Sequence, residues 1–249
     1  MPELSWSFAA VVAAAFFLAG IVKGVTGMGL PTVAIGVLSA IVTPIAAAAL
    51  MIVPAFVTNV WQLAAGPRLA ALLARLWPML VAAVIGIWGG VALLAGADTR
   101  ITAAALGIAL MAYAAYGLIA RQLSVPAARE KWLSPLIGLS SGAIAGGTGV
   151  FVIPAVPYLQ ALGLDKEDLT QALGISFVVA TVALGLGLAW HGAFRADNVV
   201  LSTLAVAPAL AGMWTGQRIR HRISPDVFRR VFLVCLFLLG LDLVARLVR

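Results

Sequence analysis

Charge is scarce in this sequence. Asp, Glu, Lys and Arg make up 10% of its 249 residues, against roughly 25% in a typical soluble domain, while hydrophobic residues make up 63%. A chain with so little polar surface cannot face water on all sides. Apolar runs recur along the whole chain, and most of them approach the roughly 20 residues that cross a bilayer. The sequence therefore predicts an all-α, multi-pass membrane protein with the lipid bilayer around it.

Cysteine and histidine are nearly absent. Cys235 is the single cysteine, which excludes an intrachain disulfide and a cysteine metal cluster. The two histidines, His191 and His221, lie in expected loops without metal-ligand spacing. The phosphate-binding loop of nucleotide hydrolases and the GxSxG and HExxH patterns are also missing. We therefore expect no catalytic residue, no metal site and no cofactor, and hence neither an enzyme nor an ATP-driven pump.

Acidic residues are rare within the apolar runs. Asp242 is the exception, and Arg246, one helical turn away, is its expected partner. A proton relay through buried carboxylates therefore has few groups to use. The net charge of +7 comes from Lys and Arg that lie mostly between the runs, as loops beside membrane helices require. This placement argues against nucleic acid as a partner.

Two of the apolar segments are too short to span a bilayer comfortably. These are residues 31–41 and 150–162, and each follows a glycine-rich stretch. The other segments lie at about 7–25, 45–64, 72–95, 101–120, 133–145, 169–190, 199–216 and 227–248. Together they predict about 8–10 transmembrane segments, and they leave open whether the glycine-rich hairpins cross fully or are re-entrant.

The glycine-rich stretches belong to an internal repeat. The pattern GxxxGxTG occurs at residues 20–27 and again at 142–149, and GxWxG occurs at 86–90 and again at 212–216. Because the two matches come in the same order at nearly the same offset, we predict two related halves, residues 1–122 and 123–249. The alternative is that these glycines only mark close helix contacts.

The loop charges predict how the two halves are oriented. The arginine-rich loop at 218–222 should be cytoplasmic. Counting back through the segments places the loops around Arg68 and Arg121 on the same side, and the Asp98 loop, the Arg195 loop and both termini outside. Each half then has five crossings, so the halves are inverted repeats, each with a glycine-rich broken helix or hairpin.

Broken helices within a bilayer indicate a binding site. Unwound backbone persists at membrane depth only where protein buries it or water reaches it, and half-helix N-termini attract anions. Pro31 and Pro154 suit the first turn of a new helix after each break. We expect Thr26 and Thr148 to donate hydrogen bonds to an anion at these breaks.

Lys23 is the most informative single residue, because it is a cation within an otherwise apolar run. Such a charge costs about 2.5–3.5 kcal/mol on insertion scales, so it normally faces a polar cavity or a partner. We expect its partner to be a backbone carbonyl, water or a bound anion; snorkelling to the interface is the alternative. Asn59 and Gln171 are further candidate donors, with interhelical hydrogen bonding as their alternative role.

The stretch FFLAGIVKGVTGMGLPTVAIGVL, with its partner LIGLSSGAIAGGTGVFVIPAVPYLQALGL and the following QALGISF, resembles the sulfite exporter TauE/SafE family. The resemblance covers essentially the whole chain. It implies a bacterial inner-membrane permease for sulfite, thiosulfate, sulfonates or related anions. It also implies that the family's glycine-rich substrate region comprises Gly24, Thr26, Gly27, Gly146, Thr148 and Gly149. The chain departs from the commoner triple-glycine form, with GMGLP in one half and GTGVF in the other.

These observations predict a secondary transporter that moves a small sulfur oxyanion or organosulfonate by alternating access. The resemblance to the sulfite exporter family implies that the direction is export. An anion channel shares the same features, and a non-transporting assembly subunit is a further alternative. The glycine face of Gly86 and Gly90 fits internal packing or a homodimer equally well.

Overall fold

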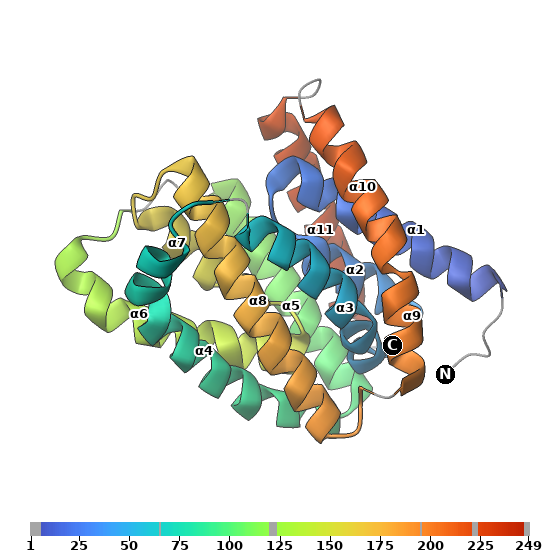
Figure 1. Ribbon diagram of the computed structural model, residues 1–249. Helices are drawn as coiled ribbons and strands as arrows, with labels where there is room; N and C mark the ends of the chain where they lie inside the picture. The colour runs from blue at the N-terminus through green and yellow to red at the C-terminus, as the bar shows by residue number, and fades with distance from the viewer. Residues whose placement is uncertain (1–5, 65, 120–123, 195, 221–223, 247–249) are drawn as a thin grey trace.

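The computed structural model describes residues 6–64, 66–119, 124–194, 196–220 and 224–246, which form eleven α-helices and no strand (Figure 1). The helices are α1 (Trp6–Thr26), α2 (Leu30–Leu38), α3 (Pro44–Leu63), α4 (Leu69–Gly96), α5 (Thr99–Ile119), α6 (Ala127–Thr148), α7 (Ala155–Ala161), α8 (Lys166–Trp190), α9 (Ala196–Leu204), α10 (Val206–Ile219) and α11 (Pro225–Ala245). The predicted all-α architecture is confirmed.

Six stretches of helix among the described residues are long and apolar enough to cross a membrane: α1, α3, α4, α5, α8 and residues Val199–Ile219 of α9 and α10. The protein is therefore a multi-pass membrane protein. Helices α6 and α11, with 22 and 21 residues, are of comparable length but are not among these six. The lower limit of the predicted 8–10 segments is reached only if both are counted as spans.

The two short apolar segments are short helices that follow glycine-rich turns, as predicted. Helix α2 has 9 residues and α7 has 7, so at about 1.5 Å of rise per residue neither reaches across a hydrocarbon core of about 30 Å. The first turn contains Gly27 and Gly29 at φ 79° and 93°, and the second begins at Gly149 at φ 77°. Glycine is favoured at these positions because other residues rarely adopt a positive φ.

The helix order of the first half recurs in the second. Helix α5 begins and ends 126 residues before α11, at Thr99–Ile119 and Pro225–Ala245. Helices α3 and α8 follow the N-caps Thr43 and Asp165, 122 positions apart, and each side chain accepts a hydrogen bond from the main-chain N–H three residues on. Helix α4 corresponds to α9 and α10 together, which are separate because the chain is interrupted at Ala205.

The repeated glycine patterns pack against each other across the two halves. A Cβ atom on Gly24 of α1 would lie 2.2 Å from the carbonyl oxygen of Met213 in α10, and one on Gly146 of α6 would lie 2.3 Å from that of Ile87 in α4. The glycines therefore do mark close helix contacts, and they do so in matching pairs. Gly90 likewise approaches the carbonyl oxygen of Ala143, so this glycine face packs within the chain rather than being left for a homodimer.

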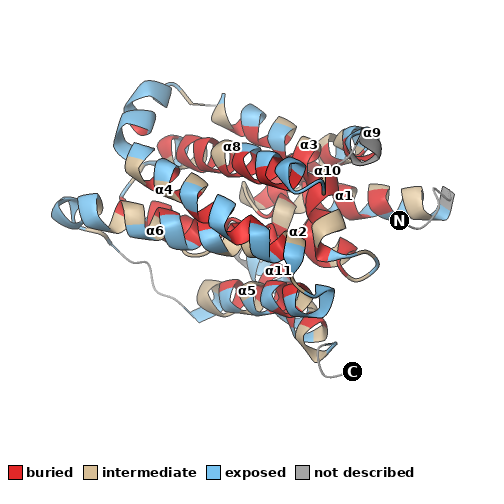
Figure 2. Cartoon of the chain, turned by 90° about the horizontal axis from the view of Figure 1, so that it is seen from below, coloured by how far each residue is buried: buried red, intermediate tan, exposed pale blue. Residues whose placement is uncertain are grey.

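Helices α3 and α8 lie at the centre and run antiparallel. Gly174 of α8 packs against Leu63, the last residue of α3, whereas Gly185 packs against Ile52, in the N-terminal half of α3. Figure 2 shows that buried residues dominate both helices, and they are the two most deeply buried of the candidate spans. Helices α5 and α11 also run antiparallel, because Gly107 packs against Gly240 and Gly117 packs against Leu233.

Candidate anion-binding site

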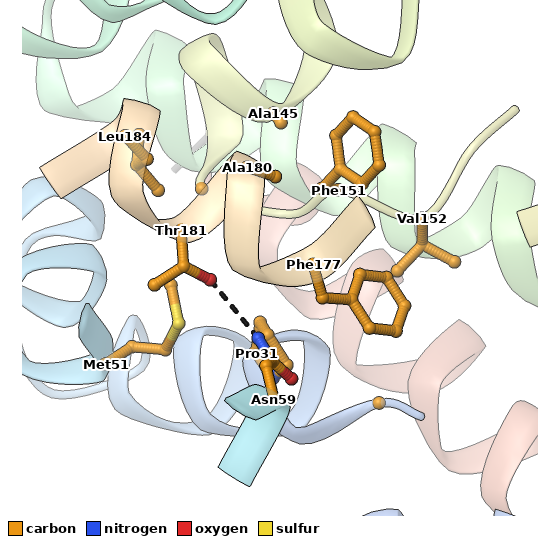
Figure 3. Close-up of a pocket in the computed structure, with 12 residues that line it drawn as sticks. Pro31, Met51, Asn59, Ala145, Phe151, Val152, Phe177, Ala180, Thr181 and Leu184 are labelled. Carbon is orange, nitrogen blue, oxygen red and sulfur yellow. Dashed lines mark hydrogen bonds between the residues drawn. The ribbon is translucent and has the colours of Figure 1, made fainter. Parts of the chain in front are cut away.

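A pocket lies where the two glycine-rich turns meet α3 and α8 (Figure 3). The first half contributes Gly29, Pro31, Met51 and Asn59, and the second contributes Ala145, Gly149, Phe151, Val152, Phe177, Ala180, Thr181 and Leu184. Most of these side chains are apolar, so the few polar atoms in the pocket determine what it can bind.

Asn59 and Thr181 supply the polar side chains of this pocket. Both are buried, and the Asn59 amide nitrogen donates to Thr181 Oγ1 at 3.3 Å. Figure 3 shows the two side chains meeting between α3 and α8. Because Thr181 Oγ1 accepts this bond, its own hydrogen is available to donate to a ligand. An amide and a hydroxyl are suitable donors for an oxyanion.

Lys23 lies behind Asn59 and is only 4% exposed. Its ammonium nitrogen donates to Thr58 Oγ1 at 3.1 Å and to the Asn59 side-chain oxygen. Snorkelling to the interface is therefore wrong, and so is a backbone carbonyl as the partner among the described residues. Because the Asn59 side-chain oxygen accepts a hydrogen bond from Lys23, the Asn59 NH2 group is directed to Thr181 at the pocket.

The start of α2 also contributes to the pocket. Its N-cap is Gly29, which provides no side-chain cap, and Pro31 occupies the first turn; both line the pocket. The first N–H groups of a helix lack intrahelical partners and carry partial positive charge. The two halves differ at this point: the second contributes Gly149, Phe151 and Val152, which precede α7, instead of the first turn of a helix.

The two threonines of the repeated pattern stabilise their own turns. Thr26 Oγ1 donates to the carbonyl oxygens of Val22 and Met28, and Thr148 Oγ1 donates to that of Ile144. Neither threonine lines the pocket. Gly27 has its carbonyl oxygen bonded to Gln62 Nε2 at 2.9 Å. These residues therefore shape the site, and their hydroxyl hydrogens are used by the main chain.

Gln171 lies away from the pocket. Its amide nitrogen donates to the carbonyl oxygens of Leu63 and Gly66, and its oxygen accepts from the main-chain N–H of Arg68 at 2.9 Å. Gln171 therefore holds the connection between α3 and α4. Gly24 and Gly146 lie in helix contacts and do not line the pocket, whereas Gly149 does.

Sequence reasoning did not single out the aromatic part of the pocket. Phe151 and Phe177 meet edge to face, with ring centroids 6.5 Å apart. Phe151 lies two residues after Gly149, so the glycine-rich sequence pattern identified the segment directly before it. Phe177 is one of many apolar residues on α8, and no local signal distinguishes it.

Comparison with family models identifies the chain. The model of the sulfite exporter TauE/SafE family matches residues 12–243, nearly the whole chain. The protein belongs to the TauE/SafE family. Comparisons with curated proteins and with solved structures find no match. Membership in TauE/SafE supports a membrane transporter of the sulfite-exporter type and confirms the resemblance carried by the two glycine-rich stretches.

Proposed function

We propose that this TauE/SafE protein is a secondary transporter of sulfite, an organosulfonate or a related small oxyanion, and that it exports this anion across the bacterial inner membrane by alternating access. The observation that carries the proposal is the pocket between the two glycine-rich turns, with the Asn59–Thr181 pair within it and buried Lys23 behind it. The site is at the centre of the membrane helices, as a transport site must be.

The bound anion would have its oxygens near the Asn59 amide, the Thr181 hydroxyl and the first N–H groups of α2. Lys23 contributes positive charge through Asn59, to which it is hydrogen-bonded. The apolar remainder of the pocket, including Phe151 and Phe177, suits the organic part of a sulfonate. Gln171, Thr26 and Thr148 are left out of this contact set because their polar atoms already have main-chain partners.

Alternating access would use residues 1–122 and 123–249 as inverted repeats. The pairs α3 with α8 and α5 with α11 hold matching positions in the two halves, and the members of each pair pack antiparallel. A twofold axis in the membrane plane produces this arrangement, whereas an axis along the membrane normal would make matching helices parallel. Rocking of the halves about the central pocket would then expose it to each side in turn.

The test is transport by the purified full-length protein in liposomes. Vesicles loaded with unlabelled sulfite, thiosulfate or methanesulfonate are diluted into trace labelled anion, and uptake against the concentration gradient of the label is measured. We expect counterflow for a sulfur oxyanion, and much slower uptake with acetate. The Asn59→Ala variant should lose most of this uptake, whereas Thr215→Ala, on the exposed face of α10, should retain it.

Two outcomes would favour the alternatives. An anion channel would show flux that never saturates and no counterflow, because a channel cannot couple opposite movements. A membrane assembly subunit would move no anion. Either result overturns the proposed carrier function.

A further inference from the structure

Lys23 is a buried amine that has no counter-ion among the residues that the structure describes. Helices α1, α2 and α3 contain no Asp or Glu, and among the described residues no carboxylate forms an ion pair with Lys23. A charge that is removed from water and left unpaired costs several kcal/mol. Whenever Lys23 is protonated, no fixed group of the described chain balances its charge, so the balance has to come from a species that binds and leaves.

The ionisable groups on the surrounding helices are engaged elsewhere or exposed. Lys23 lies on α1, which packs against α2, α10 and α11 and bonds to α3, while α8 and α5 lie beyond these helices. Helix α10 carries Arg218, exposed over the ring of Trp214. The other groups whose side chains the structure describes include Arg229, which donates to the Gly117 carbonyl, and Tyr113, which donates to Met28 Sδ. Asp242 is paired with Arg246, and Asp168 is paired with Arg68. Arg220, Arg230, Lys166, Glu167 and Cys235 are exposed, and Tyr116 is half-buried.

The hydrogen bonds of Lys23 match a neutral amine. Within the described part of the chain, its nitrogen has two acceptors, Thr58 Oγ1 and the Asn59 oxygen. Thr58 Oγ1 gives its own hydrogen to the carbonyl oxygens of Pro54 and Ala55, so it can only accept from Lys23. A neutral amine has two N–H groups, and these two partners use both of them. An ammonium has three, which leaves one donor for an anion.

We propose that Lys23 takes up one proton with each anion, so that the transporter moves anion and proton together in the same direction. The inference rests on the proposed carrier function and adds its coupling ion. In the loaded state, Lys23 is an ammonium and its charge is balanced by the bound anion. On the far side the anion leaves and the amine releases the proton to water. The empty carrier returns with neutral Lys23, so transport of a monovalent anion is electroneutral. Net export then proceeds when the outward concentration gradient of the anion exceeds the opposing pH gradient.

The test follows protons and anions together in proteoliposomes of the wild-type protein. Methanesulfonate and thiosulfate are suitable probes, because neither takes up a proton near neutral pH, and sulfite is run beside them. With the outside one pH unit more acidic, we expect methanesulfonate to accumulate inside about tenfold, with matching acidification of the lumen. An imposed membrane potential should not change this accumulation.

Substitutions at Lys23 separate binding from coupling. Lys23→Arg keeps a permanent charge and cannot return empty as a neutral side chain, so any counterflow that remains in this variant should not be accompanied by net uptake. Lys23→Gln cannot carry a proton, so any remaining flux should proceed without acidification. Arg218→Gln removes an exposed cation from the neighbouring helix α10 and should leave the proton-to-anion ratio unchanged.

The outcomes distinguish this inference from the carrier function. Net uptake of methanesulfonate by the wild-type protein without acidification of the lumen overturns proton coupling, and wild-type counterflow in the same vesicles leaves the carrier function intact. Net uptake by Lys23→Arg driven by a pH gradient as in wild type also overturns it. If sulfite, thiosulfate and methanesulfonate all fail to exchange, the carrier function fails and the inference fails with it. Because the wild-type measurement is decisive, the test does not depend on whether the variants fold.

Discussion

Asn59 and Thr181 are joined by a hydrogen bond of 3.3 Å and stand 122 positions apart, the same offset that separates the two GxxxGxTG patterns. Matching residues of two related halves meet where the halves meet, so this bond marks their junction within the pocket. The two halves contribute different chemistry there. Lys23, the charge behind Asn59, has the apolar Ala145 as its counterpart at the same offset. The region of the pocket therefore has unlike side chains at positions 122 residues apart.

The Thr181 hydroxyl should contribute directly to anion affinity. Thr181→Val keeps the shape of the side chain and removes the donor. Hydrogen bonds to charged groups are worth about 1.5–3 kcal/mol, so we expect the Kd for the transported anion to rise roughly ten- to a hundredfold. The measurement is ligand-dependent thermal stabilisation of the detergent-purified protein. Ser176→Ala is the matched control on α8, because Ser176 is buried and donates to the Ala172 carbonyl of its own helix. Equal Kd values for both variants would show that the Thr181 hydroxyl does not contribute to anion binding.

The glycine contacts between the halves should not tolerate even a methyl group. A Cβ on Gly142 would lie 2.2 Å from the carbonyl oxygen of Ala83, and one on Gly212 would lie 2.1 Å from that of Phe17. The obstructing atoms are backbone, so the helices themselves must separate. We expect Gly142→Ala and Gly212→Ala each to destabilise the protein by about 1–3 kcal/mol, seen as a lower Tm in detergent.

Gly89→Ala is the control for these contacts. It lies on α4 between Gly86 and Gly90, but a Cβ there meets no atom within 4 Å. Since alanine favours a helix more than glycine does, we expect its Tm to equal or exceed that of the wild type. Similar losses at Gly89 and Gly142 would show that the close contact at Gly142 is not the cause of the loss.

Features encoded by local pattern could be predicted from the sequence. Helical periodicity and the positions of glycine and proline located the short helices after the two turns, because these signals act within a few residues. The Asp242–Arg246 pair, predicted from its i, i+4 spacing, has an ion-pair distance of 2.6 Å. The repeat offset of 122 relates Asn59 to Thr181, and these two side chains are hydrogen-bonded to each other.

The hydrogen-bond partners of buried polar side chains could not be predicted in the same way. Gln171 and Asn59 are both buried amides within apolar segments, yet one supports a loop and the other lines the pocket. The difference depends on which main-chain groups α3 brings near α8, and that is a property of helix packing across more than a hundred residues. Thr26 was misjudged for a related reason: the nearby carbonyl oxygens of Val22 and Met28 already accept its hydrogen.

The two glycine-rich turns should differ in their tolerance of a side chain. Gly27 and Gly149 both have positive φ, but a Cβ on Gly27 meets no atom within 4 Å, whereas one on Gly149 would lie 2.6 Å from Ile35 Cδ1. We expect Gly27→Ala to cost only the backbone strain, about 1–2 kcal/mol. Gly149→Ala should cost more and also slow counterflow, because Gly149 lines the pocket. Equal effects on Tm and flux would contradict this asymmetry.

The inverted orientation can be tested at two matching loops. Asp98 precedes α5 and Ser224 precedes α11, they stand 126 positions apart, and both are exposed. With Cys235→Ser as a background without cysteine, Asp98→Cys and Ser224→Cys each introduce a single thiol. The loop charges predict Asp98 outside and Ser224 in the cytoplasm. An impermeant thiol reagent should therefore label position 98 in intact cells and position 224 only after the membrane is opened. Labelling of both positions from the same side would mean parallel halves. The antiparallel packing of α5 against α11 would then need an explanation other than a twofold axis in the membrane plane.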